Sequence, residues 1–127
     1  MKHRTLFIAG SIVMVIFGFL WLVAPAFGLQ LYGHAVGTND LACLVTRYWG
    51  SAFLGLGVIL YMAREGQSDS IAVRAIIYGG FVMSITGLAA ALNDVFVGET
   101  NALIWVSVAL YVLFSVWFGY FAFKKAP

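Results

Sequence analysis

"LFIAGSIVMVIFGFLWLVA", residues 6–24, is a run of nineteen residues without a charged side chain. An α-helix needs about 20 apolar residues to cross the hydrocarbon core of a bilayer. Three further runs of similar length follow at residues 41–63, 71–92 and 102–123, and only two charged residues lie within them. A helix satisfies its backbone hydrogen bonds internally, as lipid requires. The sequence therefore predicts four transmembrane helices over these ranges.

The composition agrees with a membrane protein. Of the 127 residues, 63% are hydrophobic and 9% are charged, whereas a typical soluble domain is about a quarter charged and about half apolar. A soluble protein of this size has too much surface for its volume to hide so many apolar side chains. We therefore expect an all-α integral membrane protein, a four-helix bundle in which residues 1–127 form a single transmembrane domain.

The first run has an alternative interpretation as a cleaved signal peptide. It follows a basic start, Met-Lys-His-Arg, and residues 24–26, Ala-Pro-Ala, resemble a small-residue cleavage site. Its apolar core is longer than the ~7–15 residues of a signal peptide, however. We therefore expect an uncleaved helix.

Basic residues in the tails and short loops predict the orientation, because cytoplasmic loops are enriched in Lys and Arg. Both tails and the second loop are basic, whereas the first and third loops contain neither Lys nor Arg. The basic residues concerned are Lys2, Arg4, Arg64, Arg74, Lys124 and Lys125. We therefore expect both termini in the cytoplasm and the protein in a bacterial inner membrane. In the amphipathic first loop we expect a short interfacial helix or a re-entrant turn.

Arg47 is the one basic residue expected in the outer half of the bundle. It lies about six residues, or roughly 9 Å, into the second predicted helix. One interpretation is a side chain that snorkels to the headgroups and anchors the helix. The other is an ion pair inside the bundle, with Asp94 as the counter-ion and with Asp40 and Asn93 as polar neighbours. Such a pair is a candidate functional or ligand site, or a structural device that fixes helix register.

Small residues share the helix faces that contain Arg47 and Asp94. Because small side chains let helix backbones approach closely, these faces predict tight packing. The residues are Gly50, Ser51 and Gly55 beside Arg47, and Gly80 and Gly87 on the face of Asp94. We therefore expect the second and third long helices to pack as antiparallel neighbours, with Gly55 close to Gly87.

The chain offers little for catalysis or for cofactor binding. Cys43 is its only cysteine, which excludes disulfide exchange by a cysteine pair. Neither histidine lies in a predicted helix, which excludes a haem held by two axial histidines in the bundle. His34 and Asp40 are a weak signal for a metal site, and no phosphate loop, nucleophile elbow or zinc motif is present. We expect no enzymatic activity, no cofactor and no metal. The basic tails suit lipid headgroups rather than nucleic acid.

A basic tail, a first helix ending in "LVAP", an amphipathic loop and "TRYWGSAFLGLGVIL" at residues 46–60 follow one another in this chain. This order resembles the DoxX-like group of small four-helix bacterial inner-membrane proteins and the related uncharacterised families. In that group an arginine followed by glycines opens the second helix. Many members also have an acidic residue shortly after the arginine, where this chain has Phe53 and Leu54. The resemblance implies the four-helix fold, and several members accompany redox or membrane complexes as accessory subunits.

We therefore expect a non-enzymatic accessory or assembly subunit, within a homo-oligomer or beside a larger membrane complex. The alternative is a binder or transporter of a small apolar or anionic ligand, with an outward-facing pocket at Arg47. A proton-coupled exporter is a weaker alternative, since the first helix of small multidrug exporters contains an acidic residue and residues 6–24 contain none. The glycine- and arginine-rich opening motif of fluoride channels is also missing from this sequence.

Overall fold

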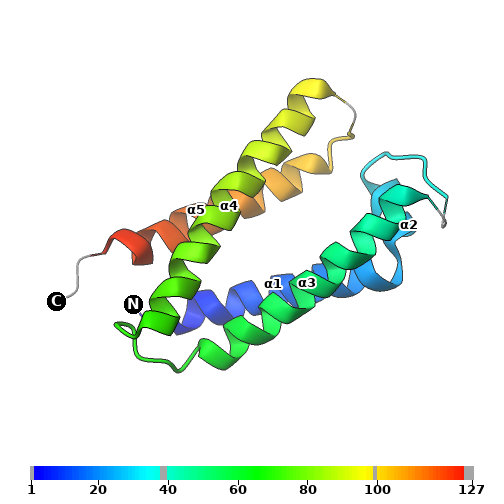
Figure 1. Cartoon of the computed structure of the whole chain (residues 1–127). Coiled ribbons are helices and arrows are strands. Elements are labelled where there is room, and N and C mark those ends of the chain that lie inside the picture. Colours follow the sequence, from blue (N-terminus) through cyan, green and yellow to red (C-terminus); the bar gives the residue numbers. More distant parts are fainter. Residues whose placement is uncertain (1, 38–39, 99, 125–127) are drawn as a thin grey trace.

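A computed structural model describes residues 2–37, 40–98 and 100–124, and within these ranges the chain forms five α-helices (Figure 1). Their bounds are α1 Arg4–Val23, α2 Pro25–Leu31, α3 Leu41–Ala63, α4 Ile71–Val97 and α5 Ile104–Phe123. The helices α1, α3, α4 and α5 are long and apolar enough to cross a membrane. The four long helices predicted from the sequence are thus present. Lys125, part of the orientation argument, lies outside the described residues.

The helix ends follow local sequence signals. Pro25 opens α2 at its first turn, where a missing backbone N–H costs nothing. The oxygen of Ser70 accepts a hydrogen bond from the Val73 backbone N–H at the start of α4, as expected of an N-cap. Gly98 ends α4 with φ 76°, and its N–H bonds to the Asp94 carbonyl, as in a left-handed C-cap. Because no such signal occurs at residue 92, α4 continues to Val97, beyond its predicted end.

The helices are arranged as two pairs, α1 with α3 and α4 with α5. In the first pair the backbones approach closely, since a Cβ on Gly50 would lie 2.6 Å from the Leu22 nitrogen and 2.7 Å from the Gly18 oxygen. The Ser11 hydroxyl also donates a 2.8 Å hydrogen bond to the Gly57 carbonyl. In the second pair, rings of α5 lie over glycines of α4: Phe118 over Gly80 and Tyr111 over Gly87.

The predicted packing of Gly55 against Gly87 is wrong. No heavy atom lies within 4 Å of a Cβ built on Gly55, and Gly87 faces Tyr111 of α5. Ser51, on the same predicted face, is exposed. Gly50, Gly80 and Gly87 do pack against helices, but against α1 and α5. A single loop joins α3 to α4, but the main contacts of α3 are with α1 and those of α4 are with α5.

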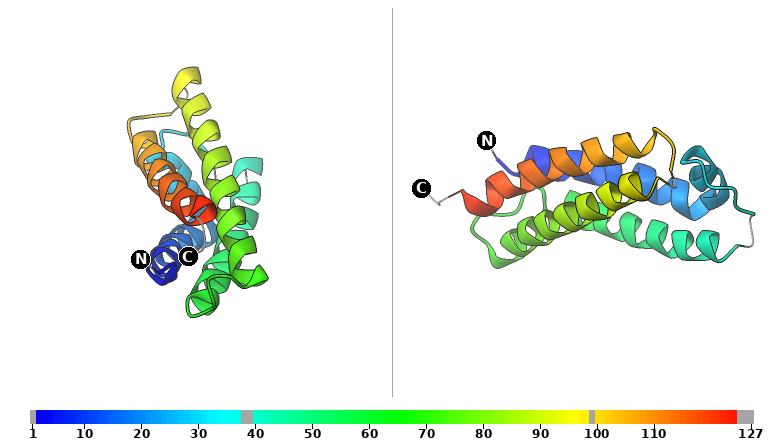
Figure 2. Two further views of the ribbon diagram at one scale, coloured as in Figure 1. Left: turned by 90° about the vertical axis from the view of Figure 1, so that its left-hand side faces the viewer. Right: turned by 90° about the horizontal axis from the view of Figure 1, so that it is seen from above.

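The two pairs share a core at one end only. We call the end with the N-terminal residues, the α3–α4 loop and the end of α5 the inner end; both termini lie there (Figure 1). The core at the inner end contains residues of all four long helices. These residues are Leu6, Phe7, Leu60, Val73, Ile77, Phe118 and Ala122. At the opposite, outer end the buried residues of a second cluster, Ala91, Ile104 and Val108, come from α4 and α5, and Tyr32 packs against them. The pairs therefore diverge toward the outer end, as Figure 2 also shows.

Candidate functional site

Arg47 lies half-buried on the side of α3 that faces α1. It is one turn before Gly50, whose position abuts the α1 backbone at Gly18 and Leu22. Residues three apart on a helix lie on the same side. The sequence placed Arg47 toward α4, whereas the structure turns this side of α3 toward the end of α1.

The structure does not bring Arg47 and Asp94 together. Asp94 and Asn93 are exposed near the end of α4, where α4 and α3 have diverged (Figure 1). Asp40 is the N-cap residue of α3, and its carboxylate accepts a 2.7 Å hydrogen bond from the Gly37 N–H. The ion pairs between described residues are Arg4–Glu65 and Arg64–Glu65, both at the inner end. The four predicted polar residues therefore do not form one site.

Hydrogen bonds that the sequence did not predict join the loops of the outer end. The Asn101 side-chain amide donates to the Leu31 carbonyl at 2.7 Å, and the Asn101 backbone N–H donates to the Tyr32 carbonyl at 3.2 Å. The Tyr32 hydroxyl and the Ser107 hydroxyl lie 2.8 Å apart. These bonds hold the end of α2 against the start of α5. We call Tyr32, Asn101 and Ser107 the outer junction.

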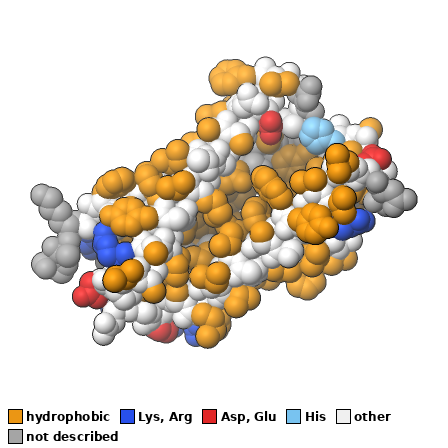
Figure 3. All heavy atoms as spheres, in the orientation of Figure 1, with side chains coloured by type: hydrophobic (Ala, Val, Ile, Leu, Met, Phe, Trp, Pro, Cys, Tyr) orange, Lys and Arg blue, Asp and Glu red, His pale blue; other side chains and the backbone are white. Residues whose placement is uncertain are grey.

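An apolar groove runs along the face of the molecule between α3 and α4. Figure 3 shows the hollow, with hydrophobic side chains on its walls and floor and with charged and histidine side chains near its outer end. The groove follows directly from the divergence of the helix pairs. In water such a surface would be unfavourable, whereas a membrane provides apolar groups to fill it.

A second hollow, of about 330 Å³, lies at the inner end; we call it the inner hollow. It is lined by the first residues of the chain and by the α3–α4 loop: Lys2, His3, Arg4, Arg64, Glu65, Gly66, Gln67 and Ser68. The sequence predicted a basic amino-terminal tail and a basic second loop, but it did not predict that these two segments lie side by side. Their proximity depends on how α1 packs on α3, which composition does not reveal.

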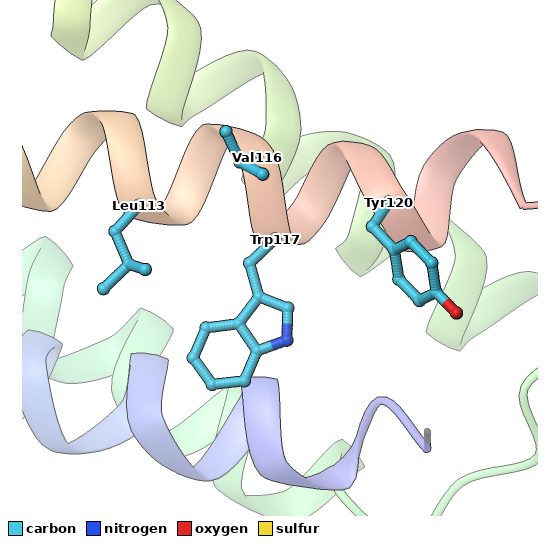
Figure 4. A pocket seen from close by; sticks show the side chains of 4 residues that line it. All are labelled: Leu113, Val116, Trp117 and Tyr120. Carbon is cyan, nitrogen blue, oxygen red and sulfur yellow. The ribbon is translucent and has the colours of Figure 1, made fainter.

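A third hollow, of about 300 Å³, is apolar and lies along α5. Leu113, Val116, Trp117 and Tyr120 line it, and Trp117 points from α5 toward α1 (Figure 4). These residues belong to the second half of α5, so the hollow lies in the inner half of the molecule. Its lining suits a hydrocarbon chain.

Comparisons with protein-family models, with curated proteins and with solved structures found no match to this chain. The site must therefore be interpreted from its own chemistry. Among the described residues, no group of three or more His, Cys, Asp or Glu side chains is placed to hold a metal ion. The features that remain are the apolar groove, the outer junction and the two hollows of the inner half.

Proposed function

We propose that this protein is a non-enzymatic accessory or assembly subunit of a bacterial inner-membrane complex or homo-oligomer. Its length and four apolar spans support a multi-pass membrane location. The basic residues of its tails and second loop support a cytoplasmic inner end. The order of tail, first helix, loop and residues 46–60 resembles the DoxX-like group, several members of which accompany membrane complexes, and this resemblance suggests the accessory role.

The observation that carries the proposal is the open groove between α3 and α4 (Figure 3). Lipid chains or a protein helix must fill it in a membrane. Gly55 on α3 and Gly79 on α4 are both exposed and have open space around the position of a Cβ. Glycine weakens a helix where it makes no contact, whereas at a helix interface it permits close approach. The exposed glycines therefore favour a partner helix.

Cross-linking of introduced cysteines tests this proposal. The natural Cys43, which is buried, is first replaced by Ala, and Gly55→Cys is then made in that background. A maleimide–benzophenone reagent, which attaches to the introduced thiol and on illumination inserts into a nearby C–H bond of any partner, should give a discrete product from Gly55→Cys in native membranes. A product of twice the chain's mass identifies a homo-oligomer, and a larger defined product identifies a subunit of another complex.

Val116→Cys is the matched control, because Val116 is a 70% exposed residue of α5. It should react with a monovalent maleimide but give no discrete cross-link. Equal products from both positions would indicate random collision in the membrane. No product from Gly55→Cys, together with a monomeric mass in mild detergent, would contradict the assembly role.

The alternative function is a binder or transporter of a small apolar or anionic ligand near Arg47. The groove favours it because it is apolar and open, with charged side chains near its outer end (Figure 3). A proteoliposome flux assay separates the two functions. Solute movement that Arg47→Gln abolishes would support the transporter, whereas an accessory subunit moves no solute by itself.

A further inference from the structure

The inner hollow has an excess of positive charge. Lys2, Arg4 and Arg64 line it with Glu65 as their one carboxylate. Glu65 Oε1 lies 2.9 Å from Arg4 Nε and 3.8 Å from Arg64 Nε. One carboxylate therefore faces two guanidinium groups, and the unbalanced charge favours an anion. Guanidinium and ammonium groups bind phosphate through charge-assisted hydrogen bonds.

His3 adds a buried hydrogen-bonding group to the wall of this hollow. The residue is 4% exposed, and its Nδ1 lies 3.1 Å from the Ser68 hydroxyl. Its Nε2 is buried without a hydrogen-bond partner among the described residues. Buried polar atoms in proteins are nearly always hydrogen-bonded, and an unsatisfied one destabilises the fold. This nitrogen is closed to solvent in the conformation described, and a rotation of the imidazole toward the hollow would bring it to an oxygen of a bound anion.

The position of the hollow favours a lipid as the source of that anion. It lies where α1 begins and α3 ends, which is the level of the headgroups if these helices span the bilayer. Basic pockets between transmembrane helices are suited to anionic headgroups. The apolar hollow along α5, in the same half of the molecule, offers a place for an acyl chain (Figure 4).

We propose that the inner hollow binds the phosphate group of an anionic phospholipid, with Arg64, Lys2 and His3 as its contacts. Arg4 shares Glu65 with Arg64 and so holds that carboxylate at the edge of the site. The proposal rests on the membrane location of the chain but not on a partner helix in the groove. Lipid binding and cross-linking can therefore fail independently.

Thermal unfolding of the full chain in a neutral detergent tests the site. Phosphatidylglycerol, phosphatidylcholine and sn-glycerol 3-phosphate are added separately. Phosphatidylglycerol should raise the melting temperature, and the two other probes should have little effect. In Arg64→Gln the apparent affinity for phosphatidylglycerol should fall about tenfold, because a hydrogen bond between charged groups is lost. Lys2→Gln, at an exposed position, is a second variant in case Arg64→Gln does not fold.

Arg74→Gln is the matched control. Arg74 is also a basic residue of the inner end, but its guanidinium donates a 2.8 Å hydrogen bond to the Tyr78 hydroxyl and does not line the hollow. This variant should keep the parent's response. Equal loss in Arg74→Gln, or no preference for phosphatidylglycerol over phosphatidylcholine, would overturn the proposal. An equal response to sn-glycerol 3-phosphate would overturn the assignment to a lipid.

Discussion

Individual glycines of α3 have opposite surroundings, although they recur along one apolar segment. Gly50 touches the α1 backbone, whereas Gly55 touches nothing within 4 Å of a Cβ position. Backbone atoms cannot move aside as the end of a flexible side chain can. A methyl group is therefore excluded at Gly50 and accommodated at Gly55.

Gly50→Ala should destabilise the protein by about 1–3 kcal/mol, the usual range for overpacking. Gly55→Ala should be neutral or should stabilise the isolated chain, because Ala is the better helix former by about 0.5–1 kcal/mol. Melting temperatures in one detergent measure both effects. A Gly50→Ala variant as stable as the parent would show that α1 and α3 are not in this close contact.

Arg47→Ala and Asp94→Ala should have additive effects on stability. The two residues lie on helices that have diverged at this level, and distant sites add within about 0.3–0.5 kcal/mol. A double-mutant cycle in detergent measures the coupling free energy. A coupling well above that range would restore the ion pair predicted from the sequence.

The packing glycines show which contacts can be predicted from the sequence and which cannot. Small side chains correctly marked Gly50, Gly80 and Gly87 as packing positions, because helix spacing determines which residues share a face. The same pattern cannot say which helix covers that face. The choice of α4 as the partner of α3 followed from their adjacency in the sequence, and the structure pairs α3 with α1.

At the scale of elements, the outer junction is the main contact between α2 and the start of α5. Tyr32 and Asn101 bind across it through a hydroxyl and an amide. Neither residue belongs to a motif, and 75 positions separate Tyr32 from Ser107. Of the two alternatives expected for the first loop, a short interfacial helix or a re-entrant turn, the structure shows a short helix, α2. Its polar attachment could not be foreseen from local sequence.

Tyr32→Phe should lower the free energy of unfolding by about 0.5–1.5 kcal/mol, the net contribution of one hydrogen bond. The ring of Phe keeps the apolar contacts of Tyr32, so the change isolates the hydroxyl. Chemical denaturation in mixed micelles measures the difference. Tyr48→Phe is the control, since Tyr48 is 70% exposed and should tolerate the change.

At the scale of the whole molecule, hydropathy alone predicted the four long helices and their approximate bounds. It could do so because a helix that faces lipid needs only length and apolar side chains. The grouping of these helices into pairs was not predictable, since every face of such a helix is apolar. Only close backbone contacts and aromatic rings over glycines distinguish the true neighbours.

Both termini lie at the inner end (Figure 1), and the basic residues predict that this end faces the cytoplasm. A reporter that is active only in the periplasm should therefore give no signal when fused after Pro127. The same reporter inserted into the loop before α3 should give a strong signal. The reverse pattern, with correct membrane insertion, would invert the orientation.

The pairing of α1 with α3 also has a consequence for synthesis. Close contacts of this pair, such as those of Gly18 with Gly50 and of Ser11 with Gly57, are made by residues that precede α4 in the chain. Proteins made from the amino end can fold early segments before later ones exist. The first hairpin of this chain is therefore able to assemble while the ribosome is still translating α4, and the second hairpin then has a finished surface on which to dock.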